Sequence, residues 1–330
     1  MTPVRTYLEE LRSTRASGAH TEETSFYPAL KALLDSVGSG LKPKVRCVVN
    51  LKNQGSGLPD GGLFTADQLG REGDRPELES TILNATPSRG AIEVKPPSFP
   101  MEKLAKSKQA SRYGNRYRHV LLTNLREFWL VEQEEKTSHV IERFALADTE
   151  EKLWLLAAHP STSAQQVETA FVEFLERVLR TPAPLAAPED LAWFLASYAR
   201  DALGKIEHAP VGSFDHVTQA LSQTLGVAFQ GEKGRHFFNS TLVQTLFYGV
   251  FSAWVLWCRE PQNSDRQFSW KDTSELLHLT ALRILFHEMT QPTMLFTKVL
   301  RDGLDLAEAA LNRVDRDLFF TRFKEHEAVQ

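Results

Sequence analysis

Apolar positions in the first 148 residues switch between helical and strand spacing. Helical periodicity predicts helices over residues 2–12, 22–37 and 101–117. Alternating or β-branched apolar residues predict strands over residues 44–50, 91–95, 119–123 and 128–131, with a further strand starting at Leu63. We therefore expect residues 1–148 to form a domain of the broad α/β class. Its more specific architecture would be α+β, with a mixed sheet flanked by helices.

From about Thr149 the strand pattern disappears and helical spacing takes over. The predicted helices cover residues 150–159, 163–180, 188–204, 215–229, 239–259, 270–286 and 294–313. Residues 149–330 are therefore expected to form a second, all-helical domain. The last segment, 316–330, keeps a helical pattern to its end, so we expect the sequence to be the N-terminal piece of a longer protein.

The stretch from Gly90 to Pro97 combines an apolar strand with two charged side chains. Alternate residues of a strand share a face, so Glu93 and Lys95 point one way while Ile92 and Val94 point towards a core. Two prolines follow Lys95 and end the strand. One interpretation is an exposed Glu–Lys pair on an edge strand, where prolines are tolerated. The other interpretation is that Glu93 and Lys95 belong to a functional site.

Carboxylates beside a lysine suit metal-dependent hydrolysis of a phosphodiester, which needs charge neutralisation and a poised water. Mg²⁺ prefers oxygen ligands, commonly one or two carboxylates with water and phosphate. Asp60, in a glycine-proline turn, and Glu93 would supply the carboxylates, and the Val94 carbonyl would supply a third oxygen. Lys95 would orient the attacking water or help to deprotonate it. Mn²⁺ is the expected substitute ion.

Glu23 is a further candidate, because the helical pattern places it at the buried edge of the first turn of the helix over 22–37. It would join the site through a water. The alternative is that a first-turn glutamate only complements the helix dipole.

The charge balance gives no global preference for nucleic acid. The 330 residues are 42% hydrophobic and 24% charged, with a formal net charge of −4. A nucleic-acid partner would therefore need a local basic face. Lys95 to Arg126 contains eight basic residues and one acidic residue. The candidates for DNA contact, for which a merely solvated face is the alternative, are Lys103, Lys106, Lys108, Arg112 and Arg116.

Several features favour a cytoplasmic protein without membrane spans. The two cysteines, Cys47 and Cys258, lie far apart in apolar runs, which is typical of buried reduced thiols. The N-terminus lacks an apolar signal region. The longest apolar run, 242–258, is interrupted by polar residues and predicts a buried helix.

Three motifs together resemble a known family of nucleases. Pro59-Asp60, Glu93-Val94-Lys95 and Gln109-x-x-x-Tyr113 resemble the PD-(D/E)xK nuclease superfamily, in the branch that carries a QxxxY helix. The sequence around Glu23 and the sequence between Leu121 and Phe128 resemble the N-terminus of large single-chain restriction–modification enzymes. That likeness covers residues 20–135 strongly and the helical remainder more loosely.

The resemblance implies a restriction-endonuclease-like fold, a Mg²⁺-dependent DNA endonuclease and a role in phage defence. It implies Asp60 and Glu93 as metal ligands, Lys95 as the catalytic lysine and Glu23 as the helix carboxylate. Gln109 and Tyr113 would support DNA or active-site contacts. Residues 149–330 would be a helical coupler, followed by methyltransferase and target-recognition domains. The partner would be double-stranded DNA, with dimerisation as a route to double-strand cleavage.

Two other functions remain open from the sequence. In the first, the chain would be a DNA-binding or regulatory module whose nuclease fold has no catalytic activity. Alternatively, the chain would be a stand-alone DNA repair nuclease acting on ends or junctions.

Overall fold

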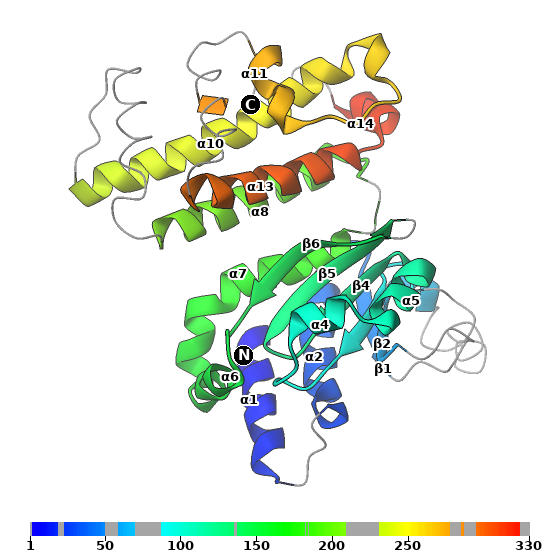
Figure 1. Cartoon of the computed structure of the whole chain (residues 1–330), viewed down its shortest axis with the longest axis vertical. Coiled ribbons are helices and arrows are strands. Elements are labelled where there is room, and N and C mark those ends of the chain that lie inside the picture. The colour runs from blue at the N-terminus through cyan, green and yellow to red at the C-terminus, as the bar shows by residue number, and fades with distance from the viewer. Residues whose placement is uncertain are drawn as a thin grey trace. The chain divides into compact units, whose positions relative to one another are not determined.

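The chain forms two compact units in the computed structural model, Met1–Ala183 and Pro184–Gln330. The described residues are 2–18, 23–49, 59–69, 87–134, 137–181, 183, 185–208, 231–277, 285–286 and 295–323. Figure 1 shows the elements of both units.

A six-stranded mixed sheet is the centre of the first unit. Its strands, in the spatial order in which they pair, are β1 (Val45–Val49), β2 (Gly61–Thr65), β3 (Ala91–Val94), β4 (His119–Thr123), β5 (Glu127–Glu134) and β6 (Thr137–Ala145). Neighbouring strands are antiparallel except β3 and β4, which are parallel. A parallel pair needs a crossover connection, and two helices between β3 and β4 supply it (Figure 1).

Helices cover both faces of this sheet. The crossover helices on one face are α4 (Met101–Ala105) and α5 (Lys108–Tyr117), which pack on Ala91, Val120 and Trp129. The helices on the other face are α1 (Pro3–Ala16), α2 (Tyr27–Ser39), α6 (Glu150–Ala158) and α7 (Pro160–Arg180). Short 3-10 turns lie at Thr24–Phe26 and Ala66–Leu69. The unit therefore has three layers with the sheet in the middle.

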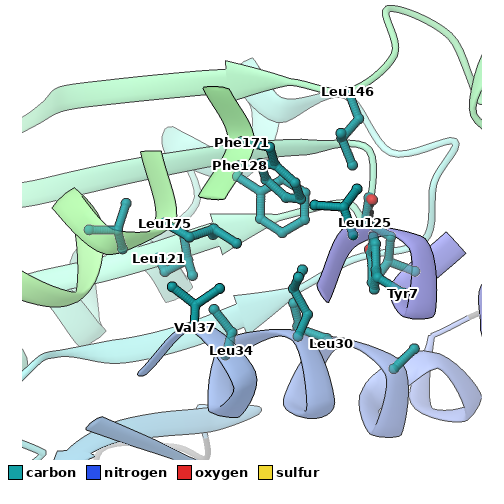
Figure 2. Close-up of a cluster of buried hydrophobic side chains, with 14 of the residues drawn as sticks. Tyr7, Leu30, Leu34, Val37, Leu121, Leu125, Phe128, Leu146, Phe171 and Leu175 are labelled. Carbon is teal, nitrogen blue, oxygen red and sulfur yellow. Dashed lines mark hydrogen bonds between the residues drawn. The ribbon is translucent and has the colours of Figure 1, made fainter. Parts of the chain in front are cut away.

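The larger of its two cores lies between the sheet and the second group of helices. Figure 2 shows Leu30 and Leu34 of α2 pointing at the sheet residues Leu121 and Phe128, with Phe171 of α7 beside them. The rings of Phe128 and Phe171 lie 4.9 Å apart between centroids. This packing fixes α2 against the sheet, and the segment before α2 carries Glu23.

The second unit is helical apart from an isolated bridge between Leu185 and Val314. Its described helices are α8 (Pro188–Glu207), α10 (Gly231–Cys258), α11 (Thr273–Leu276), α13 (Leu295–Asn312) and α14 (Arg316–Arg322), with 3-10 turns at Pro261–Asn263 and Trp270–Asp272. They enclose a separate core around Trp254 and Trp270. The predicted helix over 215–229 lies outside the described residues.

One described helical segment, Lys233–Cys258, is long and apolar enough to cross a membrane by length and composition. Half of its most apolar window is buried inside the unit. The core helix of a soluble protein has the same properties, and this agrees with the buried helix predicted over 242–258.

The predicted succession of a mixed sheet and then helices is confirmed, with local differences. The expected single helix over 101–117 is two helices, because the Ser107 hydroxyl caps α5 by accepting a hydrogen bond from the Ala110 amide at 3.0 Å. Sequence reasoning missed β6, because a register shift at Ile141 breaks the alternation and because the buried position 142 is a glutamate. α10 begins at Gly231, well before the predicted start at residue 239.

The structure also places the end of the first unit later than residue 148. Helices α6 and α7 contribute Leu153, Phe171 and Phe174 to the core on the sheet. The first compact unit accordingly runs to Ala183. Helical spacing alone does not tell whether a helix packs on the preceding sheet or on the helices that follow.

A buried ion pair ties α7 to the last strand. The Arg177 Nε donates to Glu142 Oε1 at 2.8 Å, and both side chains are more than nine-tenths buried. Replacing Arg177 by methionine leaves the Glu142 carboxylate buried without this partner. We expect the variant to lose about 3–5 kcal/mol of unfolding free energy in the first unit, measured by scanning calorimetry.

The matched control is Lys152→Met. Lys152 pairs with Asp148, but the two side chains are 59% and 76% exposed, so its removal is expected to cost at most about 1 kcal/mol. Equal losses of stability in the two variants would contradict a special contribution from the buried pair.

Candidate active site

The register between β2 and β3 brings the two predicted carboxylates together. Gly61 pairs with Ile92 and Gly62 with Ala91 in an antiparallel ladder, which sets Asp60 opposite Glu93. The Val94 amide donates to Asp60 Oδ2 at 2.8 Å and fixes that side chain at the start of β2. The 33-residue separation of Asp60 and Glu93 in sequence is therefore closed by strand pairing.

Glu93 lies in a central strand, not at an edge. β3 is bonded to β2 on one side and β4 on the other, and its four residues are buried. After the strand the Lys95 amide still donates to the Thr123 carbonyl at 2.8 Å. The two prolines begin beyond that bond, so the interpretation as an exposed pair on an edge strand is wrong.

A single glycine permits the close approach of β3 and β4. Gly90, just before β3, has φ +99°, and a Cβ there would lie 2.5 Å from the His119 carbonyl oxygen. Any other residue would be strained in this conformation and would push β3 away from β4.

Lys95 reaches back to the carboxylates from the end of β3. Its Nζ donates to Glu93 Oε1 at 2.6 Å and to the Val94 carbonyl at 3.0 Å. The same Nζ lies 3.9 Å from Glu23 Oε2. One ammonium group thus lies near both Glu93 and Glu23, so the structure brings these three predicted residues together.

Glu23 arrives at the site from a different local structure than expected. The helix predicted from residue 22 begins at Tyr27, and Glu23 stands before the 3-10 turn Thr24–Phe26. It is not a first-turn residue of α2, so the alternative role of complementing that helix dipole loses its basis. Its carboxylate is 30% exposed and faces Lys95.

Burial determines the electrostatic character of Glu93. The side chain has no exposed surface, and burial raises its pKa to about 8, with the charge of Asp60 adding to the shift. Its Oε2 atom is buried and has no hydrogen-bond partner among the residues that the structure describes. An unsatisfied carboxylate oxygen inside a protein is costly and is a natural ligand for a metal ion.

Lys95 is held in its charged form. Burial alone would lower its pKa, but the hydrogen bond and charge of Glu93, with the charges of Glu23 and Asp60, outweigh burial and raise the pKa. A raised pKa favours orienting a water or contacting a phosphate over accepting a proton.

The donor set fits Mg²⁺ or Mn²⁺. Asp60 and Glu93 offer two carboxylates, and the Val94 carbonyl lies on the same strand end. Among the described residues there is no group of three or more His, Cys, Asp or Glu side chains arranged for a metal. Mg²⁺ commonly uses only one or two carboxylates and completes its shell with water, so two carboxylates are enough.

The loop after Lys95 is held by residues whose role sequence reasoning missed. Asn124 Nδ2 donates to the Phe99 carbonyl, and Arg126 Nε donates to the Pro97 carbonyl, both at 2.8 Å. Arg126 Nη1 also donates to the Asp148 carbonyl at 2.7 Å. These bonds hold the chain where it leaves β3. A polar residue followed two positions later by arginine is too common a pattern to reveal them.

The QxxxY pair is only partly described. Gln109 lies in α5, but its side chain is outside the described residues. Tyr113 is buried, with 2% exposure, and its ring packs on that of Tyr117. Both rings lie in the core between the crossover helices and the sheet face to which Glu93 points. Such burial contradicts a direct contact with DNA. Support of the active site by Tyr113 stays a prediction.

The predicted DNA-contact residues lie on the crossover helices. Arg116 is half-buried, with its guanidinium 5.4 Å from the centroid of the Tyr117 ring. The exposed members of the set are Lys103, Lys106, Lys108 and Arg112. They form a basic surface on the helices that cover the Glu93 face of the sheet.

A large pocket of about 870 Å³ lies in the second unit, among side chains of α8, α10 and α14. None of the predicted site residues lines it. The pocket therefore plays no part in the chemistry expected of Glu93 and Lys95.

Comparison with known proteins adds no relative. No protein-family model, no curated protein and no solved structure matches the chain. The resemblance to PD-(D/E)xK nucleases therefore rests on the motifs and on the geometry above.

The raised pKa of Glu93 predicts a pH-dependent stability. Between the ordinary value of 4.5 and about 8 the folded protein holds a proton that the unfolded chain releases, so this contribution to stability is lost as pH rises through that window. Without metal, Glu93→Gln is expected to be more stable than the natural protein at pH 8 by about 1–3 kcal/mol, and nearly equal at pH 5. Scanning calorimetry in a chelator measures this.

Glu132→Gln is the matched control with the opposite sign. Hydrogen bonds from His119 and Arg118 lower the pKa of Glu132 to about 2, so its contribution is present above about 4.5 and disappears only towards pH 2. Its removal should destabilise the protein at pH 8. A Glu93→Gln variant less stable than the natural protein at pH 8 would refute the buried-carboxylate account.

Proposed function

We propose that the chain is a Mg²⁺-dependent DNA endonuclease module, with a restriction-endonuclease-like first unit. The observation that supports this proposal most strongly is the strand register that sets Asp60 opposite Glu93, with Lys95 Nζ 2.6 Å from Glu93. Two carboxylates can bind a metal ion, which would supply the charge neutralisation and activated water that phosphodiester hydrolysis needs, and the neighbouring lysine can contact the phosphate or the water.

Each residue has a distinct task in this proposal. Asp60, Glu93 and the Val94 carbonyl would hold the ion, which supplies charge neutralisation and a more acidic bound water. Lys95, kept as a cation by its carboxylate neighbours, orients the attacking water and faces the phosphate. Glu23 holds the Lys95 ammonium from the opposite side at 3.9 Å.

The wider setting follows from the resemblance and the basic surface. We propose double-stranded DNA as substrate and a restriction–modification system in the cytoplasm as the context, with dimerisation as a means of cutting both strands. Methyltransferase and target-recognition domains in the same protein would select the sequence. The second unit would couple them to the nuclease.

Cleavage of plasmid DNA tests the proposal. The full-length protein is expected to nick or linearise a plasmid with Mg²⁺ or Mn²⁺ and to be inactive in chelator. Lys95→Ala is expected to lower the rate at least about 100-fold, since it removes a positioned catalytic group. Gel electrophoresis over time measures the rate.

Lys31→Ala is the control, because Lys31 also pairs with a carboxylate, Asp35, within the first unit. Undiminished cleavage by Lys95→Ala would refute the assignment. Binding without any cleavage would favour a silent nuclease fold, and a preference for ends or junctions would favour a repair nuclease.

The basic surface predicts salt-dependent DNA binding. Alanine at Lys103, Lys106, Lys108 and Arg112 is expected to weaken binding and to reduce the slope of log affinity against log salt by about one for each DNA phosphate that the variant no longer neutralises. Fluorescence anisotropy with a short duplex in Ca²⁺ or chelator measures it.

A control variant removes the same number of exposed charges from the second unit, at Lys205, Lys233, Arg235 and Lys271. Its salt slope should stay that of the natural protein. Equal slopes for the two variants would show that the α4–α5 surface is not a preferred DNA contact.

A further inference from the structure

The hydroxyl of Tyr27 lies between two carboxylates of the proposed site. Tyr27 is the first residue of α2, and its ring is buried in the main core. The hydroxyl donates to Glu23 Oε1 at 3.0 Å. Burial raises its pKa far above the usual value, and the nearby Asp60 and Glu23 carboxylates raise it further. The phenol therefore stays neutral.

These contacts connect Lys95, Glu23 and Tyr27 on one side of the site, with Asp60 beside them. Lys95 Nζ faces Glu23 Oε2, and the other oxygen of Glu23 accepts from Tyr27. Asp60 is close enough to the Tyr27 hydroxyl to raise its pKa, and its Oδ2 accepts from the Val94 amide on the strand that carries Lys95. Glu23 thus lies between Lys95 and the tyrosine, and Asp60 is held by β3 beside the same hydroxyl.

We propose that Tyr27 is a positioning residue, whose hydroxyl fixes the Glu23 carboxylate beside Asp60 and so orders the site for metal binding. This inference rests on the proposed function and goes beyond it. Nothing in the motif Asp–Glu-x-Lys includes a tyrosine, and the apolar spacing of α2 identifies Tyr27 only as a core residue.

The physical reason is the repulsion between two nearby negative groups. A phenol has one proton to donate, and here it goes to Glu23, which weakens the repulsion between that carboxylate and Asp60. Without this bond the repulsion would be stronger and Glu23 would occupy several rotamers. Metal binding would then have to order Glu23, and affinity would fall. The ring is anchored in the core, so the hydroxyl itself needs no ordering.

Tyr27→Phe tests this, because it removes only the hydroxyl. Mn²⁺ affinity of the full chain, measured by isothermal titration calorimetry without DNA, is expected to fall roughly 10–100-fold, the usual effect of removing an outer partner of a metal ligand. Cleavage should be weakened at low Mn²⁺ and recover at saturating Mn²⁺. A residue needed only for folding would not give that recovery.

Tyr7→Phe is the matched control. Tyr7 is equally buried, and its hydroxyl donates to the Leu125 carbonyl at 2.8 Å, away from the carboxylates. It should lose stability but keep the natural Mn²⁺ affinity. Natural affinity in Tyr27→Phe, or an equal fall in affinity in Tyr7→Phe, would overturn the role of Tyr27.

Asp60→Asn separates this inference from the proposed function. If the natural protein binds Mn²⁺ and Asp60→Asn does not, the metal site stands and only the result for Tyr27→Phe decides the positioning role. If Asp60→Asn binds Mn²⁺ like the natural protein, the proposed metal site fails, and the role of Tyr27 fails with it.

Discussion

The short antiparallel ladder between β2 and β3 is the constraint on which the site depends. Two residue pairs, Gly61 with Ile92 and Gly62 with Ala91, determine that Asp60 meets Glu93. A slip by one residue would turn Glu93 to the other face of the sheet, into a core of Ile92 and Val94. The bond from the Val94 amide to Asp60 resists such a slip. The same contact therefore fixes both the register and the carboxylate.

That register creates an electrostatic cost which the fold does not remove. Glu93 is fully buried beside Asp60, and one of its oxygens has no hydrogen-bond partner within the described part of the chain. Lys95 compensates part of the charge through its bond to Glu93, yet the pKa of Glu93 remains raised. A protein optimised only for stability would place an apolar residue at this position in a central strand. Unfavourable burial of a carboxylate at a strand end is instead typical of a functional site.

The residues that can be predicted from sequence are those with local signals. Strand alternation locates Glu93 and Lys95, and helical spacing locates α2, although its start depends on the Thr24–Phe26 turn. Asp60 is recognisable as a candidate, but its position opposite Glu93 depends on pairing between distant segments, which no local pattern specifies. Spacing identifies Tyr27 only as core, because a ring that packs and a hydroxyl that bonds have the same periodicity. The boundary after residue 148 fails for a similar reason, since α7 shows an apolar face without showing what it packs on.

The two layers of helices have different consequences for the site. α2 is fixed by a large aromatic and aliphatic core (Figure 2), so its first residue, Tyr27, and Glu23 just before it stand on a rigid base. The crossover helices α4 and α5 rest on a smaller core and carry the exposed basic residues. Their connection to β3 is held by Asn124 and Arg126. The rigid layer therefore sets Glu23, while the exposed basic residues lie on the layer joined directly to Lys95. If the proposed function holds, a substrate bound to α4 and α5 would be aligned with the end of β3, where the lysine stands.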